Sequence, residues 1–171
     1  MHREVYLIVD RVRSLYNVGS LFRTADAFGV KKIYLCGYTG APPRKEISKV
    51  ALGAEKTVPW EKRGQTWKVV EELKAQGIYV VALENNMLDR SRRSLAGAPR
   101  QERRLKPAAT IDSWHPKFPL ALVVGNEVNG VSDGVLKRVD AVVEIPMLGQ
   151  KESLNVSVAA GVALYVLRHG K

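Results

Sequence analysis

Ser153 and Asn155 stand at the entrance of a C-terminal segment that is otherwise almost entirely apolar, within the stretch GQKESLNVSVAAG. Side chains of these two types accept hydrogen bonds from the free N–H groups at the start of a helix. They can equally orient a substrate or a neighbouring cation in an active site. The residue types alone leave both interpretations open, helix capping and catalysis.

A second segment, NVGSLFRTADAFG, begins with Asn17 and contains Arg23. Asn17 can cap a helix predicted over residues 18–28, whose apolar residues recur at helical spacing. Arg23 falls on another side of that helix. It is either an ordinary surface cation or, together with the positive start of the helix, a group that binds phosphate.

The third segment, VVGNEVNGVSDGVL, places Gly125 and Gly130 on either side of Glu127. Glycines in such a turn allow the backbone to approach a ligand closely. Ser132 is suited to cap a helix that begins in the following residues. Neither G-x-G-x-x-G nor G-x-x-x-x-G-K-[ST] occurs in the sequence, so the usual dinucleotide and P-loop fingerprints are missing.

All three segments follow or precede elements of one predicted sheet. Strand-like apolar runs alternate with helical patterns, which favours an α/β fold with a mostly parallel sheet covered by helices on both faces. In such sheets ligands bind beyond the carboxyl ends of the strands, so the three polar loops are expected to form one pocket. The predicted strands cover residues 4–10, 31–37, 78–84, 120–125 and 141–147, and the predicted helices cover 18–28, 66–76 and 153–168.

Composition limits the class of partner. The chain has 171 residues, enough for a single domain over residues 1–171, and its 27 Lys and Arg against 17 Asp and Glu give a net charge of +10. This charge favours a polyanion, with nucleic acid ahead of an anionic membrane. The longest apolar runs are far shorter than the ~20 residues that span a bilayer, and the N-terminus lacks a signal sequence, so we expect a cytoplasmic protein.

Metal and disulfide chemistry have no support in the sequence. Cys36 is the only cysteine, which excludes an internal disulfide and a thiolate zinc cluster. The three histidines, His2, His115 and His169, show no metal-ligand spacing. We therefore expect no metal.

Residues 88–108, LDRSRRSLAGAPRQERRLKPA, interrupt the alternation of strands and helices as a basic insertion or long loop. Seven cations against two anions give this segment a charge of +5, half of the net charge of the chain. Such a composition is typical of a solvated loop, and it also suits an arm that binds phosphates.

The three motifs resemble those of the SpoU branch of the SPOUT methyltransferases. N-x-G-x-x-x-R-T, G-N-E-x-x-G and I-P-M-x-G-x-x-x-S-L-N-V-S-V-A occur in that order and span nearly the whole chain. The resemblance implies a C-terminal deep trefoil knot, a homodimer formed partly by the last helix, and transfer of a methyl group from S-adenosylmethionine to a ribose 2′-hydroxyl of RNA. A helix that is apolar nearly all round independently favours a second subunit as its cover.

The resemblance also assigns roles to individual residues. Arg23 then acts either with an RNA phosphate as a base or as a fixed cation that stabilises an alkoxide, because a guanidinium does not give up its proton in proteins. The catalytic residues implied are Asn17, Arg23, Glu127, Ser153 and Asn155. The cofactor-binding residues implied are Leu83, Gly125, Ile145, Met147 and Leu154, and the expected RNA-binding residues are Arg11, Arg13, Arg23, Arg90, Arg92, Arg93, Arg103 and Arg104.

Two other functions remain in competition with the methyltransferase. A non-catalytic RNA-binding module could keep the same fold, although no motif residue is lost. A nucleotide-dependent oxidoreductase would need the glycine fingerprint that the chain lacks. Among RNA substrates tRNA is preferred over rRNA, because small members of this family without an added domain tend to act on tRNA.

Overall fold

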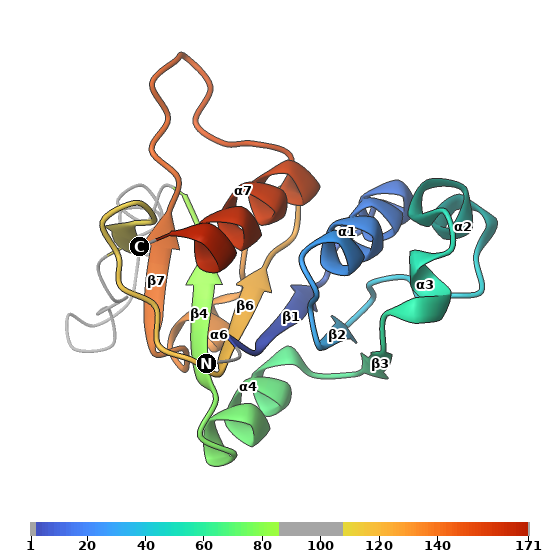
Figure 1. The fold of residues 1–171 in the computed structure, drawn as a ribbon, viewed down its shortest axis with the longest axis horizontal. Helices are drawn as coiled ribbons and strands as arrows, with labels where there is room; N and C mark the ends of the chain where they lie inside the picture. Colours follow the sequence, from blue (N-terminus) through green and yellow to red (C-terminus); the bar gives the residue numbers. More distant parts are fainter. Residues whose placement is uncertain (1–2, 86–107, 171) are drawn as a thin grey trace, which may run out of the picture.

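The computed structural model describes residues 3–85 and 108–170, which form an α/β fold around a seven-stranded sheet (Figure 1). All neighbouring strands are parallel. In the order in which they lie in the sheet, the strands are β3 (Trp60–Arg63), β2 (Lys32–Cys36), β1 (Val5–Asp10), β6 (Leu120–Val124), β4 (Tyr79–Leu83), β7 (Ala141–Glu144) and β5 (Ala108–Thr110).

Helices cover both faces of the sheet, as predicted. One apolar cluster joins a face of the sheet to the first three helices and the last one, and a second cluster joins the other face to the two remaining helices. The first group is α1 (Leu15–Ala27), α2 (Lys45–Ala51), α3 (Ala54–Thr57) and α7 (Val156–His169), and the second is α4 (Thr66–Ala75) and α6 (Asp133–Leu136). None of the helices described is long and apolar enough to cross a membrane.

The central strands form because their residues are apolar on both sides. All five residues of β6, LALVV, are buried, and β6 pairs with β1 from Val5 opposite Leu120 onward. Successive side chains of a strand point to opposite faces. Leu7 therefore packs into the first apolar cluster and Ile8 into the second.

The predicted elements are confirmed in position, with several corrections at their ends. The first helix begins at Leu15 and the last at Val156, while the strand predicted to reach residue 147 ends at Glu144. The short elements α2, α3, β3 and β5 were not predicted. Residues 88–107 of the basic segment lie outside the described residues, and the trefoil knot stays a prediction.

Candidate functional site

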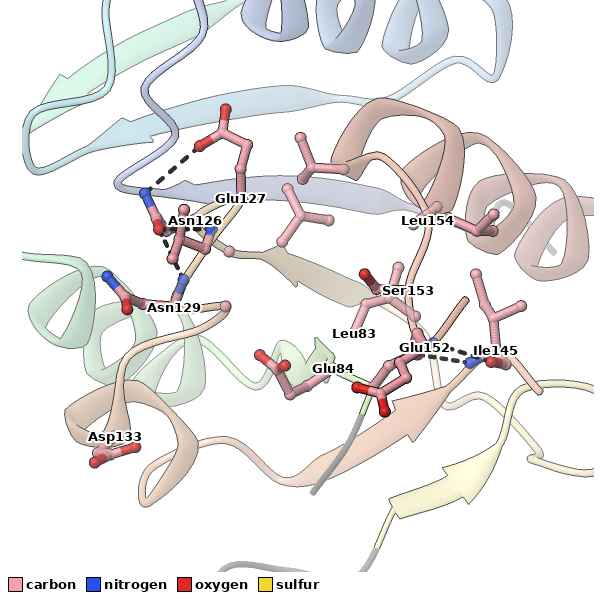
Figure 2. A pocket seen from close by; sticks show the side chains of 17 residues that line it. Leu83, Glu84, Asn126, Glu127, Asn129, Asp133, Ile145, Glu152, Ser153 and Leu154 are labelled. Carbon is pink, nitrogen blue, oxygen red and sulfur yellow. Dashed lines mark hydrogen bonds between the residues drawn. The ribbon is translucent and has the colours of Figure 1, made fainter. Parts of the chain in front are cut away.

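A cavity of about 610 Å³ lies at the carboxyl ends of β4, β6 and β7, where the polar loops were predicted to meet (Figure 2). Its volume is within the range of small-molecule and cofactor sites. Four of the five predicted cofactor-binding residues line it, namely Leu83, Gly125, Ile145 and Leu154. Met147 does not line the cavity, because the loop that follows β7 projects away from the sheet beyond Ile145 (Figure 1).

Two glycines give the cavity wall its close packing. A Cβ atom on Gly125 would lie 2.2 Å from the backbone of Gly130 and Val131. A Cβ atom on Gly130 would lie 2.2 Å from Glu84 Oε2, and Gly130 also has a positive φ of 64°. Glu84 Oε2 in turn accepts a hydrogen bond of 2.7 Å from Val131 N. Only glycine allows β6, the turn after it and Glu84 to come this close.

The cavity combines an apolar part with carboxylates. Leu83, Ile145 and Leu154 provide apolar surface, whereas Glu84 and Glu152 provide negative charge (Figure 2). Asn85 fixes the segment that leaves β7, because its Oδ1 accepts from Ile145 N and its Nδ2 donates to Ile145 O, both at 3.1 Å. This lining suits an organic cation that also carries an apolar ring.

Glu127 joins the first two sequence motifs. One carboxylate oxygen accepts hydrogen bonds from Ser14 N and Asn17 Nδ2, both at 3.0 Å, and the other accepts from Arg13 N at 3.1 Å. The loop after β1 is therefore fastened to the loop after β6. A carboxylate with three N–H donors is well suited to hold a loop in place and poorly suited to accept a further proton.

Asn155 adds the third motif to this group. Its Nδ2 donates to Asn17 Oδ1 at 3.1 Å, while its Oδ1 accepts from Ser157 N at 2.9 Å and from Ser157 Oγ at 2.7 Å. Asn155 is thus the N-cap of α7 and, at the same time, a contact of Asn17. Ser153 is exposed and lines the cavity beside it. The capping interpretation is confirmed for Asn155, and the catalytic interpretation of this segment stays a prediction.

The predicted capping role of Asn17 is wrong. Ser14 is the N-cap of α1, and its hydroxyl accepts from Asn17 N at 3.2 Å. Asn17 is the third residue of α1, and its side chain is hydrogen-bonded to Glu127 and Asn155 instead.

Arg23 does not belong to this hydrogen-bonded group. It is exposed, and its side chain makes no hydrogen bond or ion pair with other residues of the described chain. Arg13 is exposed at the edge of the site, whereas Arg11 has its Nε 3.4 Å from Oδ1 of the buried Asp10. The predicted RNA-binding residues Arg90, Arg92, Arg93, Arg103 and Arg104 lie outside the described residues.

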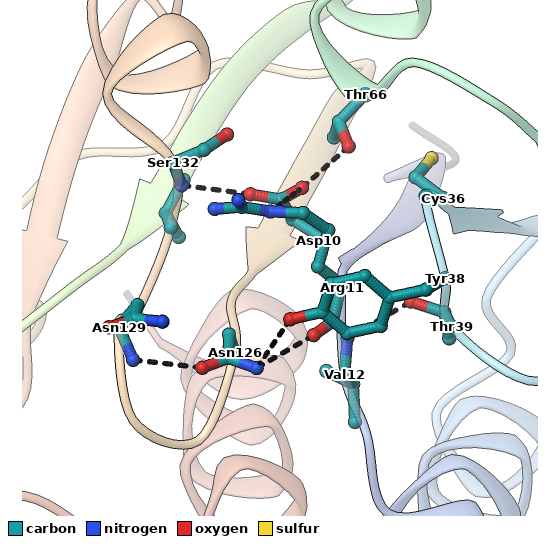
Figure 3. Close-up of polar contacts among 12 residues, drawn as sticks. Asp10, Arg11, Val12, Cys36, Tyr38, Thr39, Thr66, Asn126, Asn129 and Ser132 are labelled. Carbon is teal, nitrogen blue, oxygen red and sulfur yellow. Dashed lines mark hydrogen bonds and ion pairs between the residues drawn. The ribbon is translucent and has the colours of Figure 1, made fainter.

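Asn126 is a residue of the site that the sequence did not single out (Figure 3). It is buried, its Nδ2 donates to Arg11 O at 2.9 Å and contacts the Tyr38 hydroxyl at 3.0 Å, and its Oδ1 accepts from the N–H groups of Val128 and Asn129. The side chain of Asn126 therefore connects the three loops that follow β1, β2 and β6. In the sequence, only its position directly before Glu127 in the G-N-E-x-x-G motif could have indicated that Asn126 belongs to the site.

Glu127 is ionised at neutral pH. Partial burial raises the pKa of its carboxyl group, but the hydrogen bonds from Arg13 N, Ser14 N and Asn17 outweigh that effect and bring the pKa below its usual value. A lowered pKa disfavours Glu127 as a general base near pH 7. In the structure its carboxylate holds the loop after β1 through Arg13 N and Ser14 N, and a catalytic role stays a prediction.

We expect Glu127→Gln to lower the free energy of unfolding by about 1–2 kcal/mol at neutral pH, because two charge-assisted backbone hydrogen bonds are weakened. A carboxyl group with a lowered pKa stabilises the fold fully above its unfolded-state pKa of about 4.3, and this contribution is lost as the pH falls through the folded-state pKa. Denaturant titrations should show a constant difference between wild type and variant above about pH 6 and a shrinking one in acid. A difference that changes between about pH 6 and 8 would contradict the assigned state of Glu127.

The fold and the site define an α/β protein with a cofactor-sized cavity at the carboxyl edge of a parallel sheet, beside three polar loops that hydrogen bonds join to one another. Residues 4–165 match the SpoU rRNA Methylase family, and the chain belongs to this family. The sequence resemblance is thereby confirmed.

Named relatives agree with the family. The chain is 34% identical over 159 residues to the 23S rRNA (guanosine-2′-O-)-methyltransferase RlmB of Nitrosomonas europaea, covering 93% of this chain and 54% of that protein. It is 35% identical over 164 residues to the 23S rRNA (guanosine(2553)-2′-O)-methyltransferase RlmP of Bacillus subtilis, covering 95% and 57%. The chain thus spans little more than half the length of these relatives.

Solved structures share the fold. An AdoMet-bound rRNA methyltransferase from Sinorhizobium meliloti superposes with a TM-score of 0.79 at 28% identity, covering 98% of this chain and 58% of that one. The A. aeolicus TrmH/SpoU tRNA modifying enzyme superposes with a TM-score of 0.78 at 29% identity, covering 98% and 75%.

Proposed function

We propose that the protein transfers a methyl group from S-adenosylmethionine to a ribose 2′-hydroxyl of RNA in the cytoplasm. The observation that carries the proposal is the hydrogen-bonded chain from Glu127 through Asn17 to Asn155, which joins the three motifs beside a cofactor-sized cavity that Glu127 lines. The names of the RNA methyltransferases in the same family support it.

The cavity fits S-adenosylmethionine in its chemistry. This cofactor carries an adenine ring and a positively charged sulfonium centre, and it supplies an activated methyl group when bound. Leu83, Ile145 and Leu154 would hold the apolar ring, and Glu84 and Glu152 would favour the positive charge. Gly125 and Gly130 carry no side chain, so backbone atoms line this part of the site.

The chain's own residues contribute positioning and electrostatics. Glu127 and Asn155 fix Asn17 from two sides, so the amide of Asn17 is oriented before any substrate arrives. Ser153, on the cavity wall, can orient the RNA ribose. Arg23 stabilises the developing alkoxide as a fixed cation, or it acts together with an RNA phosphate that shares the proton lost by the 2′-hydroxyl. Its guanidinium has no hydrogen-bond or ion-pair partner among the described residues, which suits either role. Alignment of the two reactants can supply up to roughly 7–11 kcal/mol of the barrier reduction in favourable cases.

The proposal also concerns which class of RNA, tRNA or rRNA, is the substrate. The tRNA preference from the sequence has the A. aeolicus tRNA modifying enzyme in its favour, but the RlmB and RlmP relatives are named for 23S rRNA. The names of the relatives therefore do not favour tRNA over rRNA as the substrate. Tritiated S-adenosylmethionine offered with tRNA and 23S rRNA transcripts in parallel decides the substrate. If the cofactor binds and neither RNA is labelled, a non-catalytic RNA-binding module is favoured.

A homodimer through α7 is part of the same proposal. Val158, Val162 and Tyr165 are 51%, 38% and 58% exposed and recur at helical spacing, which places them on one side of α7. Apolar side chains in such a stripe mark an interface when they are contiguous.

We expect Val162→Glu to convert a dimer of twice 19.0 kDa into a monomer, because obligate interfaces bury roughly 2,000 Å² or more of largely apolar surface. Light scattering coupled to gel filtration measures the mass. Leu52→Glu is the control, since Leu52 is 67% exposed after α2, away from α7. A monomeric wild type at micromolar concentration would refute the dimer.

A further inference from the structure

Tyr38 lies at the rim of the site and has no part in the proposed reaction. It follows β2, the neighbour of β1, and is 52% exposed. Its hydroxyl is 3.0 Å from Nδ2 of the buried Asn126 (Figure 3), and the guanidinium carbon of Arg13 lies 5.8 Å from the centroid of its ring. Arg13 N also donates to Glu127. An exposed aromatic ring is thus tied to two residues that build the site.

The loop that carries Tyr38 is held in place on both sides. The hydroxyl of Thr39, a fully buried residue, accepts from Val12 N at 3.0 Å and donates to Val9 O at 3.3 Å. Lys62 Nζ donates to Gly37 O at 2.6 Å and also to Thr39 O. A Cβ atom on Gly40 would lie 2.1 Å from Leu15 Cδ2, so this part of the loop is pressed against the start of α1.

A rigid, exposed tyrosine loses little conformational freedom when a ligand stacks on it. Aromatic side chains bind unpaired RNA bases by stacking, and arginine adds attraction to both the base and the phosphate. The net charge of +10 favours a nucleic acid over a neutral partner for the chain as a whole, and Arg13 places a cation at this ring.

Resting on the proposed function, we propose that Tyr38 and Arg13 form a stacking platform for an unpaired base of the RNA substrate next to the methylated nucleotide. Tyr38 supplies the ring face, Arg13 supplies the cation, and Asn126 positions the ring by its contact with the hydroxyl. The platform reads the single-stranded character of the RNA, because a base inside a helix already stacks on its neighbours.

The test uses the full chain and a single-stranded uridine oligonucleotide, about 12 nucleotides long, with one 2-aminopurine. Stacking on Tyr38 should quench the 2-aminopurine fluorescence in the wild type. Tyr38→Ala should bind the oligonucleotide about tenfold more weakly and lose the quenching, whereas Tyr38→Phe, which keeps the ring, should stay within about twofold of wild type. Calorimetry with S-adenosylmethionine checks that each variant retains its cavity.

Tyr16→Ala is the matched control, because Tyr16 is also 52% exposed but lies on α1, and in the described chain its ring contacts neither Arg13 nor Asn126. Its affinity should equal that of wild type. Equal binding and quenching by Tyr38→Ala and wild type would overturn the platform and leave the methyltransferase proposal intact. A wild type that binds no RNA at low salt would overturn the proposed function and the platform with it.

Discussion

Replacing Arg23 with alanine is expected to reduce methyl transfer at least about 100-fold, because it removes a cation that stabilises the developing alkoxide. Affinity for S-adenosylmethionine should stay within about twofold of wild type, since Arg23 does not line the cavity. The fold should also be unaffected, because the exposed Arg23 has no hydrogen bond or ion pair within the described chain. Single-turnover kinetics and calorimetry measure the two effects separately.

Two further variants define what Arg23 contributes. Arg23→Lys keeps the charge but not the planar donor geometry, so it should recover only part of the lost rate. Lys137→Ala removes an exposed cation beside α6, which covers the opposite face of the sheet from α1, and it should leave the rate unchanged. Wild-type turnover by Arg23→Ala on its RNA substrate would show that the assigned role is wrong.

A single methyl group on Gly125 should disable the cofactor site. The added Cβ atom would lie 2.2 Å from two backbone atoms of the turn, which has no flexible side chain to move aside. The turn must shift, at a cost of about 1–3 kcal/mol in the free energy of unfolding. Glu127 would shift with it, so we expect methyl transfer by Gly125→Ala to fall by roughly 100-fold or more.

Gly134→Ala provides the control for this change. A Cβ atom on Gly134, within α6, meets no atom within 4 Å, and alanine favours a helix over glycine. This variant should bind S-adenosylmethionine as wild type does and be slightly more stable. If Gly125→Ala keeps wild-type cofactor affinity and turnover, the close packing of the cavity wall is not needed for function.

The sheet could be predicted because the sequences of its central strands are typical of buried parallel strands. Apolar runs such as LALVV in β6 are strand-sized and buried on both faces, and helical patterns separate them from the next strand. The edge strand β3, WEKR, is mostly charged and half-exposed, and β5 has only three residues. Neither carries a hydrophobic period, so their pairing depends on neighbours that the sequence does not place.

The site was harder to predict from the sequence than the central strands, for a different reason. The motifs identified Asn17, Glu127 and Asn155, but Ser14 and Asn17 are both cap-forming residues three positions apart. Glu127, 110 residues away in sequence, decides between them, since it binds the side chain of Asn17. Asn126 was missed for the same reason, because its partners Arg11 and Tyr38 come from two other loops.

Nucleoside mass spectrometry of the reaction product tests the central claim most directly. Unmodified tRNA and 23S rRNA transcripts would be incubated with the protein and S-adenosylmethionine, digested to nucleosides and analysed for the position of the methyl group. The account predicts a cofactor-dependent 2′-O-methylnucleoside from one of the two RNAs, absent with Arg23→Ala. A methyl group on a base, or no methylated product from either RNA while the cofactor binds, would contradict it.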